Sequence, residues 1–226
     1  MSTAMLQRTA RLTLALTLLS TSWALGASPL TFRFESSGGA PVSDVVLTAG
    51  GPAPTSAATM AIMDQQDKAF RPYVLPVRVG TEVSFPNSDQ IRHHVYSFSA
   101  AKRFEIRLYH GEPGEAVVFD EPGVAALGCN IHDNMVGFIY VTDQAHFGKS
   151  DGTGEVTLDL PDEVRRINVW HPDLSFDSSK VLSLSLAEIA RDGDVYVINL
   201  GIATPDPDPQ AIDPADTGRF QQFLPD

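Results

Sequence analysis

The segment 128–135 carries three side chains that bind soft metal ions. Cys129, the only cysteine of the chain, is followed by His132 and Met135 at the spacing C-x2-H-x2-M. A second source of imidazole, the pair His93-His94, lies upstream in an apolar, strand-like stretch. Two imidazoles, one thiolate and a weak axial thioether form the ligand set of copper electron-transfer sites, whereas zinc rarely takes a thioether. The spacing therefore predicts a copper site.

Each of these residues alone has a more ordinary explanation. A lone cysteine or methionine is usually a buried apolar residue, and an isolated histidine is more often at the surface. The combination at this spacing reverses that expectation. The pair His93-His94 leaves the upstream ligand open, because neighbouring side chains of a strand face opposite sides and cannot both reach one ion. The histidine that does not bind is expected at the solvent edge, or as an electron or proton contact near the copper.

The elements that must position these ligands are strands. Short β-rich runs bounded by Gly, Pro, Asn and Asp recur along the chain, and few segments show helical periodicity. This pattern is typical of an antiparallel sandwich. The ligand loop lies between two apolar runs, 124–127 and 136–141, which are expected to anchor it in the core. The predicted strands are 30–34, 44–47, 73–79, 81–85, 94–98, 104–108, 116–119, 124–127, 137–141, 155–160, 165–170, 181–186 and 195–200.

The start of the chain has the composition of a signal peptide. Arg8 and Arg11 precede an apolar run at 12–19, and small residues follow at 24–27. The run is too short to span a bilayer comfortably, and no later segment is long and apolar enough. We therefore expect export to the periplasm and a mature chain without a membrane span; a retained N-terminal anchor is the alternative. A single cysteine cannot form an internal disulfide, so in an oxidising compartment it needs burial or a metal.

The chain divides into five predicted segments. A signal peptide is expected at 1–27, N-terminal β strands at 28–59, a copper domain at 60–143, a C-terminal β-rich unit at 144–200, and a disordered, acidic, Pro-rich tail at 201–226. The N-terminal and C-terminal strands are expected to share a second sheet. A single extended sandwich is the alternative.

The formal charge of −12 disfavours binding to nucleic acid or anionic membrane. It is compatible with a basic partner or with solubility alone. The sequence has no Gly-rich phosphate loop, nucleophile elbow or H-E-x-x-H motif. It also has no second histidine cluster of the kind that catalytic copper requires. These absences argue against an enzyme.

The central residues resemble the cupredoxins, the blue-copper proteins of the plastocyanin and azurin type, over about 60–143. The loop spacing is similar to that of amicyanin, although prolines around the second histidine of that loop are absent here. Phe70-Arg71-Pro72 resembles the F-x-P element of the family, and Phe85-Pro86-Asn87 resembles the segment whose asparagine braces the cysteine loop. His93-His94-Val95 is similar to the family's His-Asn-Val.

The resemblance implies a cupredoxin-like Greek-key β-sandwich with a smaller β-rich flanking unit. It also implies that one type 1 copper ion is held by His93, Cys129, His132 and Met135. The wider sequence, including Trp170-His171-Pro172, resembles bacterial methylamine-utilisation proteins.

These observations predict a periplasmic type 1 copper protein that carries single electrons between redox partners. The expected partner is a cytochrome c or a periplasmic dehydrogenase. His132 is the expected route for the electron, with Val136 and Phe138 framing the docking patch. The alternatives are a copper storage or delivery module without redox work, and an interaction protein with a degenerate metal site.

Overall fold

The computed structural model describes residues 26–53 and 59–205, and these residues form strands, turns and loops without a helix. The predicted all-β fold, a β-sandwich with a β-rich flanking unit, is confirmed. Residues 1–25 of the predicted signal peptide and residues 206–226 of the predicted tail lie outside the described residues. Among the described residues, no helix is long and apolar enough to cross a membrane.

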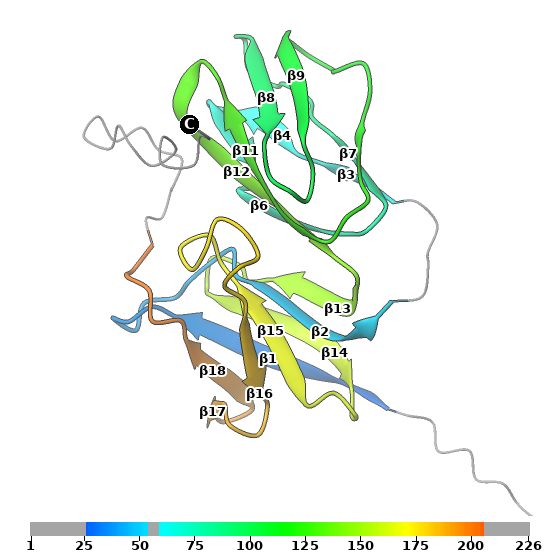
Figure 1. Ribbon diagram of the computed structural model, residues 1–226. Helices are drawn as coiled ribbons and strands as arrows, with labels where there is room; N and C mark the ends of the chain where they lie inside the picture. Colours follow the sequence, from blue (N-terminus) through cyan, green and yellow to red (C-terminus); the bar gives the residue numbers. More distant parts are fainter. Residues whose placement is uncertain (1–25, 54–58, 206–226) are drawn as a thin grey trace, which may run out of the picture.

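Ten consecutive strands form one group, called here the central unit (Figure 1). A sheet of five strands has the order β6-β12-β11-β8-β9, a sheet of three has the order β10-β7-β3, and β4 and β5 form a hairpin. The strands are β3 (Met60–Ile62), β4 (Asp64–Gln66), β5 (Ala69–Arg71), β6 (Val74–Arg78), β7 (Thr81–Ser84), β8 (His93–Ser97), β9 (Phe104–Tyr109), β10 (Val117–Phe119), β11 (Gly123–Cys129) and β12 (His132–Thr142).

The remaining strands come from both ends of the described chain and form the flanking unit, in the lower half of Figure 1. Its two sheets have the orders β14-β1-β18-β17 and β13-β2-β15-β16. The strands are β1 (Ala27–Glu35), β2 (Val46–Pro52), β13 (Gln144–Lys149), β14 (Glu155–Pro161), β15 (Arg166–Trp170), β16 (Leu182–Ser185), β17 (Ala190–Asp192) and β18 (Val195–Asn199). The expected pairing of N-terminal with C-terminal strands is therefore present, while the exact domain boundaries stay a prediction.

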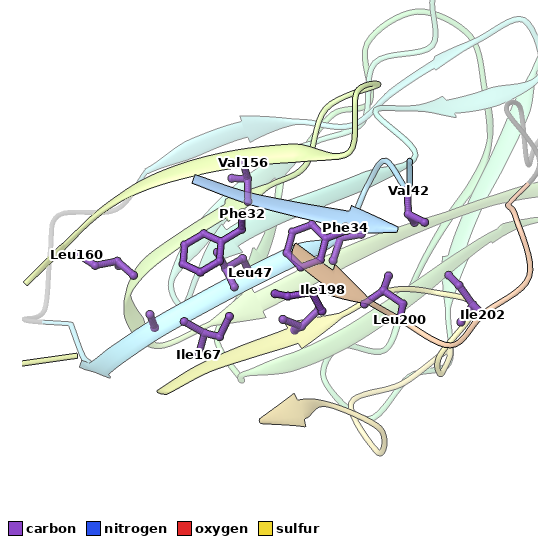
Figure 2. Close-up of a cluster of buried hydrophobic side chains, with 13 residues drawn as sticks. Phe32, Phe34, Val42, Leu47, Val156, Leu160, Ile167, Ile198, Leu200 and Ile202 are labelled. Carbon is purple, nitrogen blue, oxygen red and sulfur yellow. The ribbon is translucent and has the colours of Figure 1, made fainter. Parts of the chain in front are cut away.

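Each unit has its own buried core because successive strand residues alternate between the two faces of a sheet. In the central unit, Val83 and Phe119 from the smaller sheet meet Leu127 and Ile139 from the larger one, and Cys129 belongs to the same cluster. In the flanking unit, the rings of Phe32 and Phe34 lie over aliphatic side chains of the opposite sheet and the C-terminal strand (Figure 2). The five-stranded sheet, which carries His93, Cys129 and His132, therefore lies on a packed apolar layer.

A third apolar cluster joins the two units. Trp170, at the end of β15 in the flanking unit, is fully buried. Its ring lies edge-on to Phe138 at 5.8 Å between centroids and tilted against Tyr140 at 5.3 Å, and both residues belong to β12. The indole N–H of Trp170 donates to the carbonyl of Asp177 (2.9 Å), which satisfies the polar group inside this cluster. The face of the five-stranded sheet that points away from the central core is thus partly covered by the flanking unit.

Candidate metal centre

Two places in the five-stranded sheet supply the candidate ligands. His93 opens β8, Cys129 closes β11 and His132 opens β12, and β8 and β12 both pair with β11. The β11–β12 pairing shifts register between Gly128 and Cys129, so that Cys129 comes opposite His132 across a tight turn. The turn and the neighbouring strand therefore bring residues 36 positions apart in sequence to one point.

The three donor atoms lie close together. The Cys129 sulfur is 3.5 Å from Nδ1 of His132 and 3.9 Å from Nδ1 of His93, and the two Nδ1 atoms are 3.2 Å apart. His93 is fully buried, Cys129 is nearly so, and His132 is half-buried. Among the described residues, they form the single cluster of three or more His, Cys, Asp or Glu donors with metal-binding geometry.

These separations fit a metal ion. The point equidistant from the three donor atoms lies about 2.1 Å from each, close to the roughly 2.0–2.3 Å of metal–nitrogen and metal–sulfur bonds. No backbone movement is needed to bring the donors into range. Geometry alone does not separate copper from zinc, but two imidazoles with one thiolate in a trigonal arrangement are typical of blue copper.

His93 lies in the cluster, and His94 does not. The ring of His94 points to the other face of the sheet, where Nε2 lies 3.0 Å from a carboxylate oxygen of Glu105 and the ring packs against Tyr96. The structure thus places His93, and not His94, beside Cys129 and His132. The other histidines with described side chains, His110, His146 and His171, lie outside the cluster.

Met135 is placed in the core beside the cluster. Its side chain is 1 % exposed and belongs to the same buried group of residues as Cys129. The fourth candidate ligand is therefore on the same side of the sheet as the thiol. Metal binding by the four residues stays a prediction.

A carboxylate that the sequence analysis missed contacts the cluster. Oδ2 of Asp89 lies 2.6 Å from Nε2 of His93, the ring nitrogen that faces away from Cys129. Burial acts to raise the pKa of Asp89, but hydrogen bonds from the Lys68 N–H, from His93 and from the Asp67 N–H outweigh it and lower that pKa. An acidic residue four positions before a candidate ligand was the only sequence signal for it.

The segment before β8 is held by a second set of hydrogen bonds. The side-chain amide of Asn87 donates to the carbonyls of Ile91 and Tyr109, and its oxygen accepts from the N–H of Asp89. The resemblance implied that Asn87 braces the cysteine loop; these bonds instead shape the 87–91 loop that leads into His93. The Tyr109 hydroxyl donates to the Phe85 carbonyl, and burial raises the pKa of Tyr109 to about 12.

The expected docking patch is wrong in its choice of residues. Phe138 is fully buried in the cluster with Trp170, and Val136 packs against that cluster. Residues of β12 alternate in direction, so both side chains face the flanking unit; Val136 is partly buried there and Phe138 fully. The exposed apolar residues next to the site are Ile91 and Ile131, whose side chains are 40 % and 49 % exposed.

No protein-family profile and no curated protein matches the chain. Solved structures match parts of it. A copper-containing nitrite reductase from Thermus scotoductus SA-01 is similar at 26% identity and a TM-score of 0.34, over 41% of this chain and 25% of that chain. This chain thus matches about a quarter of the reductase.

Two smaller proteins are matched over almost their whole length. An oxidised single-residue variant of amicyanin is similar at 19% identity and a TM-score of 0.34, over 42% of this chain and 98% of that chain. A purple cupredoxin from Nitrosopumilus maritimus is similar at 24% identity and a TM-score of 0.32, over 37% of this chain and 99% of that chain. Each match concerns less than half of this chain.

Proposed function

We propose that the protein is a type 1 copper protein that carries single electrons between redox partners in the periplasm. The observation that carries the proposal is the convergence of the Cys129 sulfur and the Nδ1 atoms of His93 and His132 within 3.9 Å of one another. His93, Cys129 and His132 would hold one copper ion, with Met135 as the weak axial ligand. The copper domain would span about residues 60–143.

The surroundings suit electron transfer more than catalysis. A bound copper ion would supply a one-electron couple between Cu(I) and Cu(II). Fast transfer requires ligands that hardly move, and here two paired strands and a tight turn hold them above a packed core. The cluster is buried on the side of His93 and Cys129, which limits access for a substrate. We therefore infer a carrier and not an enzyme.

The electron would pass between the copper ion and the partner through His132. This half-buried imidazole is the cluster's most solvent-accessible member, and the exposed side chain of Ile131 lies next to it in sequence. An apolar surface around an exposed ligand favours a brief contact with another redox protein. We propose a cytochrome c or a periplasmic dehydrogenase as the partner, with no role for nucleic acid. A place among methylamine-utilisation proteins is part of the same proposal.

The test is to load the purified mature protein with one equivalent of Cu(II). An intense visible absorption band and a reversible one-electron potential are expected, because a copper–thiolate bond absorbs strongly. A colourless Cu(II) adduct would contradict the proposal. Rapid loss of copper to a competing chelator, without a reversible potential, would favour the storage or delivery alternative instead.

A further inference from the structure

The carboxylate of Asp89 accepts hydrogen bonds from two directions. On one side Oδ2 lies 2.6 Å from Nε2 of His93. On the other side, the N–H of Asp67 donates to Oδ1 (2.8 Å) and the N–H of Lys68 donates to Oδ2 (2.9 Å). The Asp89 side chain is only 14% exposed. One carboxylate thus links a ligand histidine to a backbone turn of another strand pair.

That turn is the two-residue loop of the β4–β5 hairpin. Gln66 pairs with Ala69, and the two residues between them, Asp67 and Lys68, have φ angles of 57° and 56°. Positive φ at both positions is the type I′ geometry preferred by two-residue hairpins, but it is unfavourable for side chains other than glycine, asparagine or aspartate. The two hydrogen bonds to Asp89 stabilise this conformation, so the exposed turn and the carboxylate hold each other in place.

The bond to Asp89 also decides which nitrogen of His93 carries the proton. A carboxylate only accepts hydrogen bonds when it is ionised, so Nε2 must be the protonated nitrogen of the neutral ring. Nδ1 then carries the lone pair and faces Cys129 and His132. Outer partners of this kind fix ring orientation and increase ligand basicity at metal sites.

We propose that Asp89 and the Asp67–Lys68 turn form a bracket that positions His93 for metal binding, a role that rests on the proposed function of the site. Asp89 is a positioning residue that acts through His93. The exposed hairpin turn is thereby coupled to the metal centre, although neither of its two side chains belongs to the donor cluster. A change in the backbone of the turn is expected to alter the metal site.

The first test needs no metal. The tautomer of His93 is measured by nitrogen-15 NMR of the metal-free protein, at a pH well above the ordinary imidazole pKa. The native ring should be protonated at Nε2, and Asp89→Ala should shift part of the population to the Nδ1-protonated form, because the variant leaves no carboxylate to accept from Nε2–H. Asp120→Ala is the matched control, since Asp120 pairs with Lys102 at the surface. An unchanged tautomer in folded Asp89→Ala would overturn the proposal.

The second test uses the copper-loaded protein. Asp89→Ala should weaken copper binding about 10- to 100-fold, as found for outer partners of metal-bound histidines. Insertion of one glycine between Asp67 and Lys68 displaces the two N–H groups and should weaken binding in the same direction. The double change Asp67→Asn with Lys68→Gly keeps both N–H groups and suits positive φ, so native affinity is expected. Native affinity after the insertion would overturn the role of the turn.

The two proposals can fail separately. A native protein that binds no copper would contradict the proposed function, while the tautomer measurement would still test the bracket. A native protein that binds copper normally and keeps its affinity in folded Asp89→Ala would contradict the bracket alone.

Discussion

The thiol of Cys129 is buried next to two imidazole nitrogens, and a buried free thiol in an apolar surrounding is normally inert. A metal ion changes this, because it deprotonates the thiol on binding and takes the negative charge into its own coordination. The arrangement of His93 and His132 around the sulfur is the one that the proposed copper site requires. In the proposed copper site, the optical and redox properties would depend on this sulfur.

We expect Cys129→Ser to remove the intense visible band while leaving the fold intact. Serine is of similar size, but its hydroxyl is a hard, weakly acidic ligand that cannot replace a thiolate on copper. The measurement is the absorption spectrum of the copper-treated variant beside the unfolding curve of its metal-free form. An intense band that persists in the variant would contradict the assignment of the sulfur as a ligand.

We expect Met135→Leu to raise the reduction potential without unfolding the protein. Leucine keeps the volume and apolarity of this core position, and such swaps usually cost less than about 1.5 kcal/mol. It removes the axial thioether, a donor that stabilises the more highly charged Cu(II) form and tunes the potential. Voltammetry of the loaded variant checks the result. An unchanged potential would show that the sulfur of Met135 does not contact the ion.

The sequence predicted which candidate ligands come together better than it predicted their surroundings. Cys129 and His132 were identifiable because a short loop places their spacing directly in the sequence. The choice between His93 and His94 depended on the direction of one strand, which residue types cannot give. Asp89 was missed because its partners, the N–H groups of residues 67 and 68, are backbone atoms with no residue-type signature.

At the scale of elements, apolar strands were predicted well and short polar ones were not. The buried strand β11 lies within two residues of its predicted limits, and β12 ends one residue after its predicted limit. β12 begins at His132, however, whereas 132–135 was predicted as part of the ligand loop. The hairpin of β4 and β5 was not predicted, because its sequence is largely polar and its strands have three residues each. Its turn was not predicted either, because neither Asp67 nor Lys68 is the glycine by which two-residue hairpin turns are usually recognised in a sequence. Such strands are stabilised by tertiary contacts and leave little local pattern.

The close approach of β5 to β12 requires a glycine at position 137. A Cβ atom there would lie 2.7 Å from Cβ of Phe70 and 3.1 Å from its Cγ. We expect Gly137→Ala to destabilise the protein by about 1–3 kcal/mol, because Phe70 is fully buried and has little room to move. Denaturant unfolding measures the change. Gly114→Ala is the control, since nothing lies within 4 Å of its Cβ position, and equal loss in both variants would contradict the steric explanation.

At the scale of the whole molecule, the central unit is an insertion between β2 and β13 of the flanking unit. The chain therefore crosses between the units twice, and strands from both ends of the described chain close the flanking sheets. The shared cluster around Trp170 and Phe138 packs the units together. The stability of the flanking unit is thus expected to influence the stability of the five-stranded sheet, which carries the candidate ligands.

His171, which follows Trp170, is a buried histidine, and we expect it to make the stability of the flanking unit depend on pH. Burial, which outweighs the nearby carboxylates of Asp173 and Asp44, lowers the pKa of His171 from its ordinary value of 6.5. The unfolded chain then binds a proton more readily than the folded one. The contribution of His171 to stability is therefore complete above pH 6.5 and is lost as the pH falls through the folded-state pKa.

We expect His171→Gln to flatten the fall in unfolding free energy below that pH, relative to the native protein. Urea unfolding at a series of pH values measures the difference. His110→Gln, at an exposed position, is the control. The same slope in native protein and His171→Gln would exclude His171 as the source of the pH dependence.

Trp170 packs on β12, so we expect the flanking unit to restrain the strands that carry the candidate metal ligands. Truncation of a buried tryptophan to alanine typically costs about 3–5 kcal/mol, and Trp170→Ala would also leave the Asp177 carbonyl without its donor. Phe176→Ala is the milder variant, because the side chain of Phe176 is only half-buried. Its ring centroid lies 5.3 Å from that of Phe138, in the same cluster. In both variants we expect faster amide exchange in β12 under native conditions, and a larger effect for Trp170→Ala.

Ile198→Ala, in the flanking core away from this cluster, controls for a general loss of stability. If β12 exchanged no faster in the first two variants than in the control, the flanking unit would not restrain the ligand strands.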